Sequence, residues 1–133
     1  MKKLIFAFAI IFCTVAMAYA LSDWTDALTY KLKAGDSWKT TTTSGYDMGQ
    51  DKNSDANYFD VNTVSKTMSS KPSFRLVNSN NEVRSNSVTT ANTGLYVRGS
   101  GNTGVIGYSY YGSIKPAWNQ LGTDTIKLQM RIY

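Results

Sequence analysis

Apolar and polar residues alternate along much of this 133-residue chain, and this alternation predicts β-strands. The pattern is strictest at the C-terminal end, where four apolar residues are separated by single polar ones: Ile126, Leu128, Met130 and Ile132. Successive side chains of a strand point to opposite faces, so these four share one face. We therefore predict a central or well-covered final strand. Truncation before Met130 should leave the protein unfolded or aggregated, whereas Lys127→Ser or Arg131→Ser should lower its stability little.

The stretch Thr93–Ile114 carries two aromatic-rich apolar runs on either side of the glycine-rich turn 99–104. Leu95 and Val97 alternate with more polar neighbours before the turn. A second alternating run follows the turn and places four residues on one face: Ile106, Tyr108, Tyr110 and Ile114. Glycine adopts positive φ without steric cost, which allows the chain to reverse. We predict a β-hairpin here, at the centre of the domain.

Further alternating or β-branched runs predict the remaining strands, at 28–32, 38–43, 58–64, 73–77 and 82–90. We expect the first two of these to pair as a hairpin, and 44–57 to form a long polar loop. No segment has a convincing helical period. About seven or eight strands at this spacing favour an all-β fold, an antiparallel β-sandwich or jelly roll, with a small closed barrel as the alternative.

The first twenty residues have the pattern of a secretory signal peptide. Lys2 and Lys3 precede the apolar run 4–15, and Ala18-Tyr19-Ala20 is a small-x-small cleavage site. An uncleaved membrane anchor is the alternative, but the run is short for a membrane span. We expect residues 1–20 to be removed and residues 21–133 to form a single secreted domain with no transmembrane segment. The charged region and the signal length are typical of bacteria.

Removal of the signal peptide also removes the only cysteine, Cys13, and the chain contains no histidine. The mature domain then has no disulfide, no cysteine nucleophile and no thiolate metal site. Catalysis would need a carboxylate pair or a serine–lysine dyad. Ser65 and Lys66 are neighbours on a predicted strand and would point to opposite faces. We predict a protein that is not an enzyme.

The net charge of +5 falls by two when Lys2 and Lys3 are removed. Nucleic-acid-binding domains usually cluster their basic residues and carry more charge. Here six basic residues stand singly along predicted strands: Arg75, Arg84, Arg98, Lys115, Lys127 and Arg131. We expect them to lie on solvated outer faces, and we expect no nucleic-acid partner.

Aromatic residues are the first candidates for a binding site. Five of them could form a flat platform on which sugar rings stack: Tyr96, Tyr108, Tyr110, Tyr111 and Trp118. Amide neighbours such as Asn119 and Gln120 would supply hydrogen bonds to a sugar. Tyrosine and tryptophan also pack in sandwich cores and favour strands. For any one of the five, core or strand-face packing is the stronger expectation.

The polar segment before the third predicted strand has acidic and amide side chains at alternate positions, which suits a hard cation such as Ca²⁺. The candidate calcium ligands are Asp51, Asn53 and Asp55. The segment resembles the start of an EF-hand loop, but Ala56 stands where that loop needs glycine and Asn62 where it needs glutamate. Such residues are also common in exposed loops, so we expect a solvated loop and no required cofactor.

Four features together resemble small secreted, uncharacterised β-proteins of Gram-positive bacteria. They are the signal peptide, the strand WKTTTT at Trp38, the strand and turn FRLVNSNNEVRS at Phe74–Ser85, and the tyrosine-rich run at Tyr108–Tyr111. The resemblance implies a secreted β-domain and assigns no functional residue.

Export, aromatic excess and the lack of catalytic residues favour a secreted, non-enzymatic binding protein. The expected ligand is a glycan or cell-wall polymer at the cell surface. One alternative is an antimicrobial or toxin-like protein that acts on competitors' envelopes, which its basic second half would suit. Another is an extracellular structural protein that self-associates through sheet edges.

Overall fold

The computed structural model describes residues 23–40, 48–101 and 104–133, and this part of the chain contains nine β-strands and no helix. The predicted signal peptide and the second half of the predicted strand 38–43 lie outside the described residues. The strands are β1 (Leu28–Lys33), β2 (Lys39–Thr40), β3 (Gly49–Asp51), β4 (Tyr58–Lys66), β5 (Ser73–Val77), β6 (Val88–Thr89), β7 (Tyr96–Ser100), β8 (Ser109–Lys115) and β9 (Thr123–Ile132).

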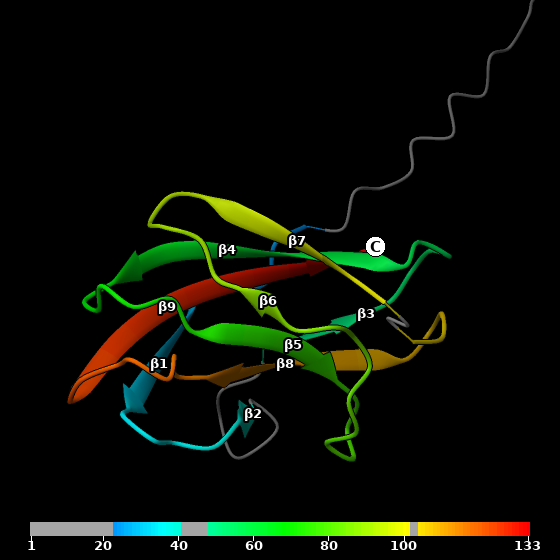
Figure 1. The fold of residues 1–133 in the computed structure, drawn as a ribbon. Helices are drawn as coiled ribbons and strands as arrows, with labels where there is room; N and C mark the ends of the chain where they lie inside the picture. The colour runs from blue at the N-terminus through cyan, green and yellow to red at the C-terminus, as the bar shows by residue number, and fades with distance from the viewer. Residues whose placement is uncertain (1–22, 41–47, 102–103) are drawn as a thin grey trace, which may run out of the picture.

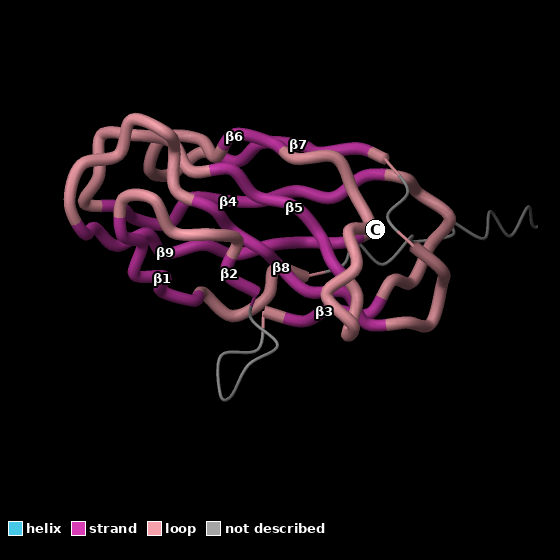
Figure 2. The backbone as a smooth tube through the Cα atoms, turned by 60° about the horizontal axis from the view of Figure 1, so that its bottom comes forward, coloured by secondary structure: helices cyan, strands magenta, loops and turns pink. Residues whose placement is uncertain are grey.

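The strands form two antiparallel sheets that pack face to face (Figure 1). Sheet A has the order β1-β9-β4-β7, and sheet B has the order β2-β8-β5-β6, with β3 also paired to β8. The connecting loops gather at the two ends of the sandwich (Figure 2). The predicted all-β antiparallel sandwich is confirmed, with nine described strands in place of seven or eight.

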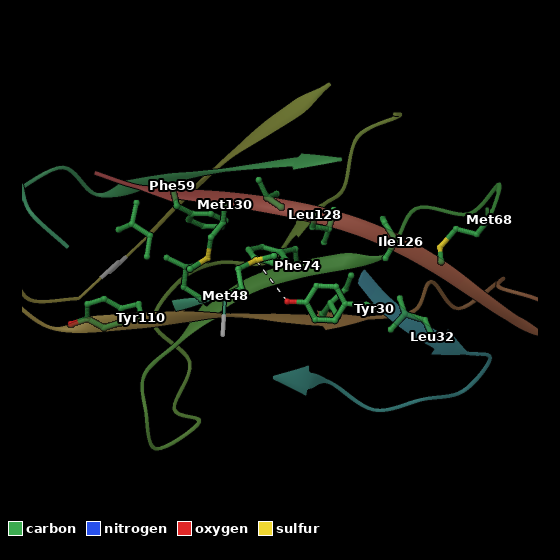
Figure 3. Close-up of a cluster of buried hydrophobic side chains, with 14 residues drawn as sticks. Tyr30, Leu32, Met48, Phe59, Met68, Phe74, Tyr110, Ile126, Leu128 and Met130 are labelled. Carbon is green, nitrogen blue, oxygen red and sulfur yellow. Dashed lines mark hydrogen bonds between the residues drawn. The ribbon is translucent and has the colours of Figure 1, made fainter. Parts of the chain in front are cut away.

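The core lies between the two sheets and is built from the inward side chains of both (Figure 3). Phe59 of sheet A and Phe74 of sheet B meet at its middle, with ring centroids 6.0 Å apart. Met48 enters from the segment before β3, and its sulfur accepts a hydrogen bond from the Tyr30 hydroxyl at 3.7 Å. Full burial of a large apolar side chain stabilises a fold by about 1.5–3 kcal/mol. The alternating sequence pattern therefore becomes a shared apolar interior.

The C-terminal strand is central, as predicted. β9 lies between β1 and β4 in sheet A. Its four alternate apolar side chains are fully buried in the core: Ile126, Leu128, Met130 and Ile132. The strand thus contributes both backbone pairing on two sides and a row of core residues.

The predicted central hairpin is wrong. β7 pairs with β4 in sheet A, whereas β8 pairs with β5, β2 and β3 in sheet B. The connection between β7 and β8 therefore crosses from one sheet to the other. Ile106 and Tyr108, which the sequence places in the second strand, are exposed and precede it. Alternation sets the face of each residue in a strand but not the partner of the strand.

The predicted hairpin between the first two strands is also wrong, because β1 pairs with β9 and β2 pairs with β8. The predicted loop 44–57 contains a short strand, β3, which adds to β8. Fully buried Met48 anchors this strand to the core. Glycine and aspartate are poor strand formers, so pairing to β8 overrides local propensity here.

Within the described residues, no helix is long and apolar enough to cross a membrane.

Candidate functional site

The five aromatic residues predicted to bind a ligand do not gather on one surface. Trp118 lies in the β8–β9 loop at one end of the sandwich, and Tyr96 is exposed on the outer face of sheet A. Tyr108 is exposed in the connection before β8, a segment that lies at the opposite end of the sandwich in Figure 1. Tyr111 is half-buried in β8, and Tyr110 is a core residue. A single stacking platform of all five is therefore absent.

Tyr110 has a structural part in the fold. Its side chain is buried in the core, and its hydroxyl accepts a hydrogen bond from the Val105 backbone N–H at 2.6 Å. The same hydroxyl donates to the Val105 carbonyl at 3.3 Å. The ring packs in the interior while its polar end holds the loop that precedes β8.

The three candidate calcium ligands, Asp51, Asn53 and Asp55, are all exposed. The Asp51 carboxylate accepts a hydrogen bond from the Ser109 hydroxyl on β8. The side chain of Lys52 is buried, and its ammonium group donates to the main-chain oxygens of Ala56 and Tyr133. Across the described residues, no group of three or more histidine, cysteine, aspartate or glutamate side chains could hold a metal ion.

A cleft of about 780 Å³ opens at the end of the sandwich where the β1–β2, β4–β5 and β8–β9 loops meet. In Figure 1 these loops lie at the left of the molecule. The lining is mostly hydroxyl, amide and charged: Gly35, Asp36, Ser69, Ser70, Lys71, Ser73, Thr89, Lys115, Pro116, Ala117, Trp118 and Asn119. We call this the loop-end cleft.

Trp118 stands at this cleft with 97% of its surface exposed. The loop that carries it is nevertheless held firmly. Buried Gln120 donates through Nε2 to the Leu32 carbonyl at 2.7 Å, and Ala34 N–H donates to the Gly122 carbonyl at 2.8 Å. A fixed loop that exposes an indole ring to solvent is a preorganised stacking surface, because the loop loses little conformational entropy when a ligand binds.

The loop-end cleft has an excess of positive charge. Lys71 and Lys115 are exposed along its lining. The only acidic lining residue, Asp36, forms an ion pair with Lys39 at 2.7 Å. Hydrogen bonds from the Lys39 side chain and the Lys33 backbone lower the pKa of Asp36, so it stays ionised and paired. The two cleft lysines thus lack a cleft carboxylate of their own and suit an anionic ligand.

A second cluster covers the outer face of sheet A. Asp60 on β4 lies directly between Arg98 on β7 and Arg131 on β9 in the strand register. Asp60 Oδ1 and Oδ2 accept from Arg98 Nε and Nη2 at 2.8 and 3.0 Å. Oδ2 also accepts from Arg131 Nη2 at 3.0 Å and from the Tyr133 hydroxyl at 2.6 Å. Both carboxylate oxygens therefore accept hydrogen bonds, one at Oδ1 and three at Oδ2.

Aromatic rings frame these two arginines. The Arg98 guanidinium carbon lies 4.3 Å from the Tyr58 ring centroid, and that of Arg131 lies 4.5 Å from the Trp24 centroid. Trp24 in turn meets Tyr96 edge to face at 6.1 Å. Cations over aromatic faces are attracted by the ring quadrupole. We call the whole set the outer-face cluster: Trp24, Tyr58, Asp60, Tyr96, Arg98, Arg131 and Tyr133.

Electrostatics fix the charges in the outer-face cluster. Burial alone would raise the pKa of Asp60, but hydrogen bonds from Arg98, Tyr133 and Arg131 outweigh it and lower the pKa. The same bond to Asp60 raises the pKa of Arg98. Burial and the bond to Asp60 raise the pKa of the Tyr133 hydroxyl, which stays protonated as a donor. The charged side chains of the cluster are thus two guanidinium cations and one carboxylate.

Sequence reasoning missed the outer-face cluster and treated Arg98 and Arg131 as solvated residues of outer faces. The signal was present, since aromatic, charged and amide residues occupy alternate outward positions at 58–62, 96–98 and 129–133. The cluster was not predicted because the predicted hairpin paired the strand of Arg98 with the wrong neighbour. Only the order β9-β4-β7 brings these three runs side by side.

No protein-family model, curated protein or solved structure matches this chain.

Proposed function

We propose that this chain is a secreted, non-enzymatic binding protein that holds a glycan or cell-wall polymer at the cell surface through the loop-end cleft. Trp118 would stack on a sugar ring, and the hydroxyl and amide groups beside it would bond to sugar hydroxyls. Lys71 and Lys115 would hold acidic substituents of the polymer. The signal-peptide pattern at residues 1–20 supports export.

The observation that carries the proposal is the exposure of Trp118 on a fixed loop. A large ring that is 97% exposed gains nothing from burial in the domain itself. The loop around it is nonetheless anchored through Gln120 and Gly122. Aromatic anchors presented on a rigid frame are typical of binding hot spots.

The test is retention of residues 21–133 on insoluble cell-wall preparations and on polysaccharides, followed by tryptophan fluorescence. We expect Trp118→Ala to lose about fivefold to 150-fold in affinity, because stacking on one aromatic ring is worth about 1–3 kcal/mol. Trp118→Phe keeps an aromatic face and should retain part of the affinity.

Matched controls come from the same molecule. Tyr108→Ala removes another exposed aromatic residue outside the cleft and should leave the affinity unchanged. Thermal melts of all variants should agree, since Trp118 makes little burial contribution. The proposal would be wrong if the wild-type protein and Trp118→Ala were retained equally, or if no polymer retained the protein.

A second candidate function rests on Leu121, which is 87% exposed on the same loop as Trp118. Tryptophan and leucine beside lysines also suit insertion into the interface of an anionic bilayer. This favours the alternative of a protein that acts on competitors' envelopes. Co-sedimentation with phosphatidylglycerol vesicles separates the two functions. Leu121→Ser should weaken binding to vesicles strongly, while its effect on binding to polysaccharide should be small.

A further inference from the structure

The outer-face cluster contains more cationic donors than its own acceptors use. Asp60 is the one side-chain carboxylate of the cluster, and it faces two guanidinium groups. Its side chain is completely buried, whereas the Arg98 side chain is 50% exposed. None of the described hydrogen bonds of Arg98 uses Nη1. The Nε of Arg131 is buried with no hydrogen-bond partner in the structure. The side chains of the cluster therefore carry one more positive charge than negative.

Asp60 positions Arg98. The two parallel bonds from Nε and Nη2 fix the plane of the guanidinium group and so hold the unused Nη1 in a fixed position. A donor that is already held in place loses little entropy when it binds an oxyanion. The ring of Tyr58 lies against the guanidinium at 4.3 Å and limits its movement further. The residue is thus held in place and half exposed at the same time.

The rim of the cluster suits a ring-shaped ligand. Tyr96 is 56% exposed and is braced by Trp24 at 6.1 Å. It occupies the outward position two residues before Arg98 on the same strand, so both side chains stand on one face. A ligand that places an anionic group on Arg98 can therefore lay an attached ring or chain toward Tyr96.

We propose that the outer-face cluster is a second binding site, which recognises a carboxylate or phosphate group carried by a sugar or polyol. Arg98 binds the oxyanion, Tyr96 contacts the attached ring or chain, and Asp60 is a positioning residue. The site lies on the face of sheet A, away from the loop-end cleft, and it does not rest on the function proposed for that cleft. Charge complementarity selects the ligand class.

The experiment is an NMR titration of ¹⁵N-labelled residues 21–133, observing the Nε–Hε signals of the arginines. The probes are trigalacturonic acid for the carboxylate source, glycerol 3-phosphate for the phosphate source and maltotriose as the neutral control. We expect the Arg98 signal to shift and saturate with one or both anions, and the anion that binds identifies the source. Maltotriose should leave the signal in place.

Arg98→Ala should weaken binding of the anion at least about tenfold. Arg84→Ala is the matched control, because Arg84 is an arginine outside the cluster that pairs with exposed Glu82 at 2.5 Å. Should Arg98→Ala fail to fold, Arg98→Lys and Tyr96→Ala serve instead. The first loses the Nη1 donor and the second loses the rim contact, and each should weaken anion binding severalfold. Trp118→Ala should leave this titration unchanged, which separates failure here from failure at the cleft.

Two results would overturn the proposal. One is an Arg98 signal that does not move with either anion up to about 10 mM, a range that would detect even millimolar affinity. The other is an anion affinity that stays the same in folded Arg98→Ala or, where that variant does not fold, in both Arg98→Lys and Tyr96→Ala.

Discussion

Asp60 lies on the outward side of β4, yet its side chain is completely buried beneath its partners. An ionised carboxylate is costly to bury unless it is paired and fully hydrogen-bonded. Arg98, Arg131 and Tyr133 together meet that condition. At the scale of single residues, therefore, the outer face of sheet A depends on one carboxylate that organises three neighbours.

Asp60→Asn should lower the free energy of unfolding by about 2–3 kcal/mol at pH 7, because it removes the charge that pairs with both arginines. Chemical denaturation followed by fluorescence measures the change. Asp26→Asn, at an exposed aspartate near the start of the described chain, is the control and should cost little. Equal losses for the two variants would show that the Asp60 network contributes no stability.

The pH dependence follows from the lowered pKa of Asp60. A carboxylate whose pKa is lower in the folded state contributes stability that is complete above its unfolded value, near 3.8. That stability is lost as the pH falls through the lower folded pKa. The melting temperature of the wild-type protein should therefore drop more steeply below about pH 4 than that of Asp60→Asn. Parallel pH profiles would contradict this assignment.

At the scale of the elements, Gly99 shows how closely β7 approaches the core. A Cβ atom at this position would lie 2.2 Å from the Phe59 ring, which is fully buried between the sheets. The ring occupies the space that a side chain would need. β7 can therefore pair with β4 only because this inward position lacks a side chain.

Gly99→Ala should destabilise the fold by about 1–3 kcal/mol, the usual cost of overpacking a core. Ser100→Ala, at the next and exposed position of the same strand, is the control and should change stability little. Thermal melts of the two variants provide the comparison. A Gly99→Ala variant as stable as Ser100→Ala would mean that Phe59 can move aside freely.

The last strand carries the second prediction at this scale. Deletion of residues 130–133 removes Met130 and Ile132 from the core and ends the pairing of β9 with β4 early. The loss of two fully buried side chains, at about 1.5–3 kcal/mol each, is large against a total stability of about 5–15 kcal/mol. We expect an unfolded or aggregated chain by circular dichroism. A cooperative melt near the wild-type temperature would show that this strand is dispensable.

The structure revises the companion expectation about charged residues of β9. Lys127→Ser should still lower the free energy of unfolding little. The Arg131 side chain is only 19% exposed and is bound to Asp60. Arg131→Ser should therefore lower the free energy of unfolding clearly more than Lys127→Ser. The alternating pattern placed both residues correctly on the outward side, but it could not distinguish a solvated side chain from one inside a network.

At the scale of the whole molecule, β9 connects the two candidate sites. It begins after the loop that carries Trp118 and ends beside Tyr133 in the outer-face cluster. One site lies at an end of the sandwich and the other on a face. A polymer could contact both surfaces of one molecule, which would raise its overall affinity through effective concentration.

Calcium should have no effect on the stability of the whole domain. Asp51, Asn53 and Asp55 are exposed, and Asp51 already accepts a hydrogen bond from Ser109. A cation bound only by the folded state would raise the melting temperature by mass action. We therefore expect equal melting temperatures in millimolar calcium and in chelator. A rise of several degrees with calcium would restore these residues as a cation site.

The sequence by itself determined the strands with strong alternation and the faces that enter the core. The strand at Ser73–Val77 occurs as predicted, and the apolar side of β9 is buried as predicted. These features are local, because the two-residue period of a strand and the free energy of apolar burial act within each segment.

Tertiary structure decided which strands pair, and with that it decided both candidate sites. Adjacent strands such as β7 and β8 join different sheets, so neighbours in sequence are not neighbours in the fold. Asp60, Arg98 and Arg131 meet only because β4 lies between β7 and β9. Strand pairing depends on hydrogen bonds and burial summed over distant segments, and no local pattern of residues contains that sum.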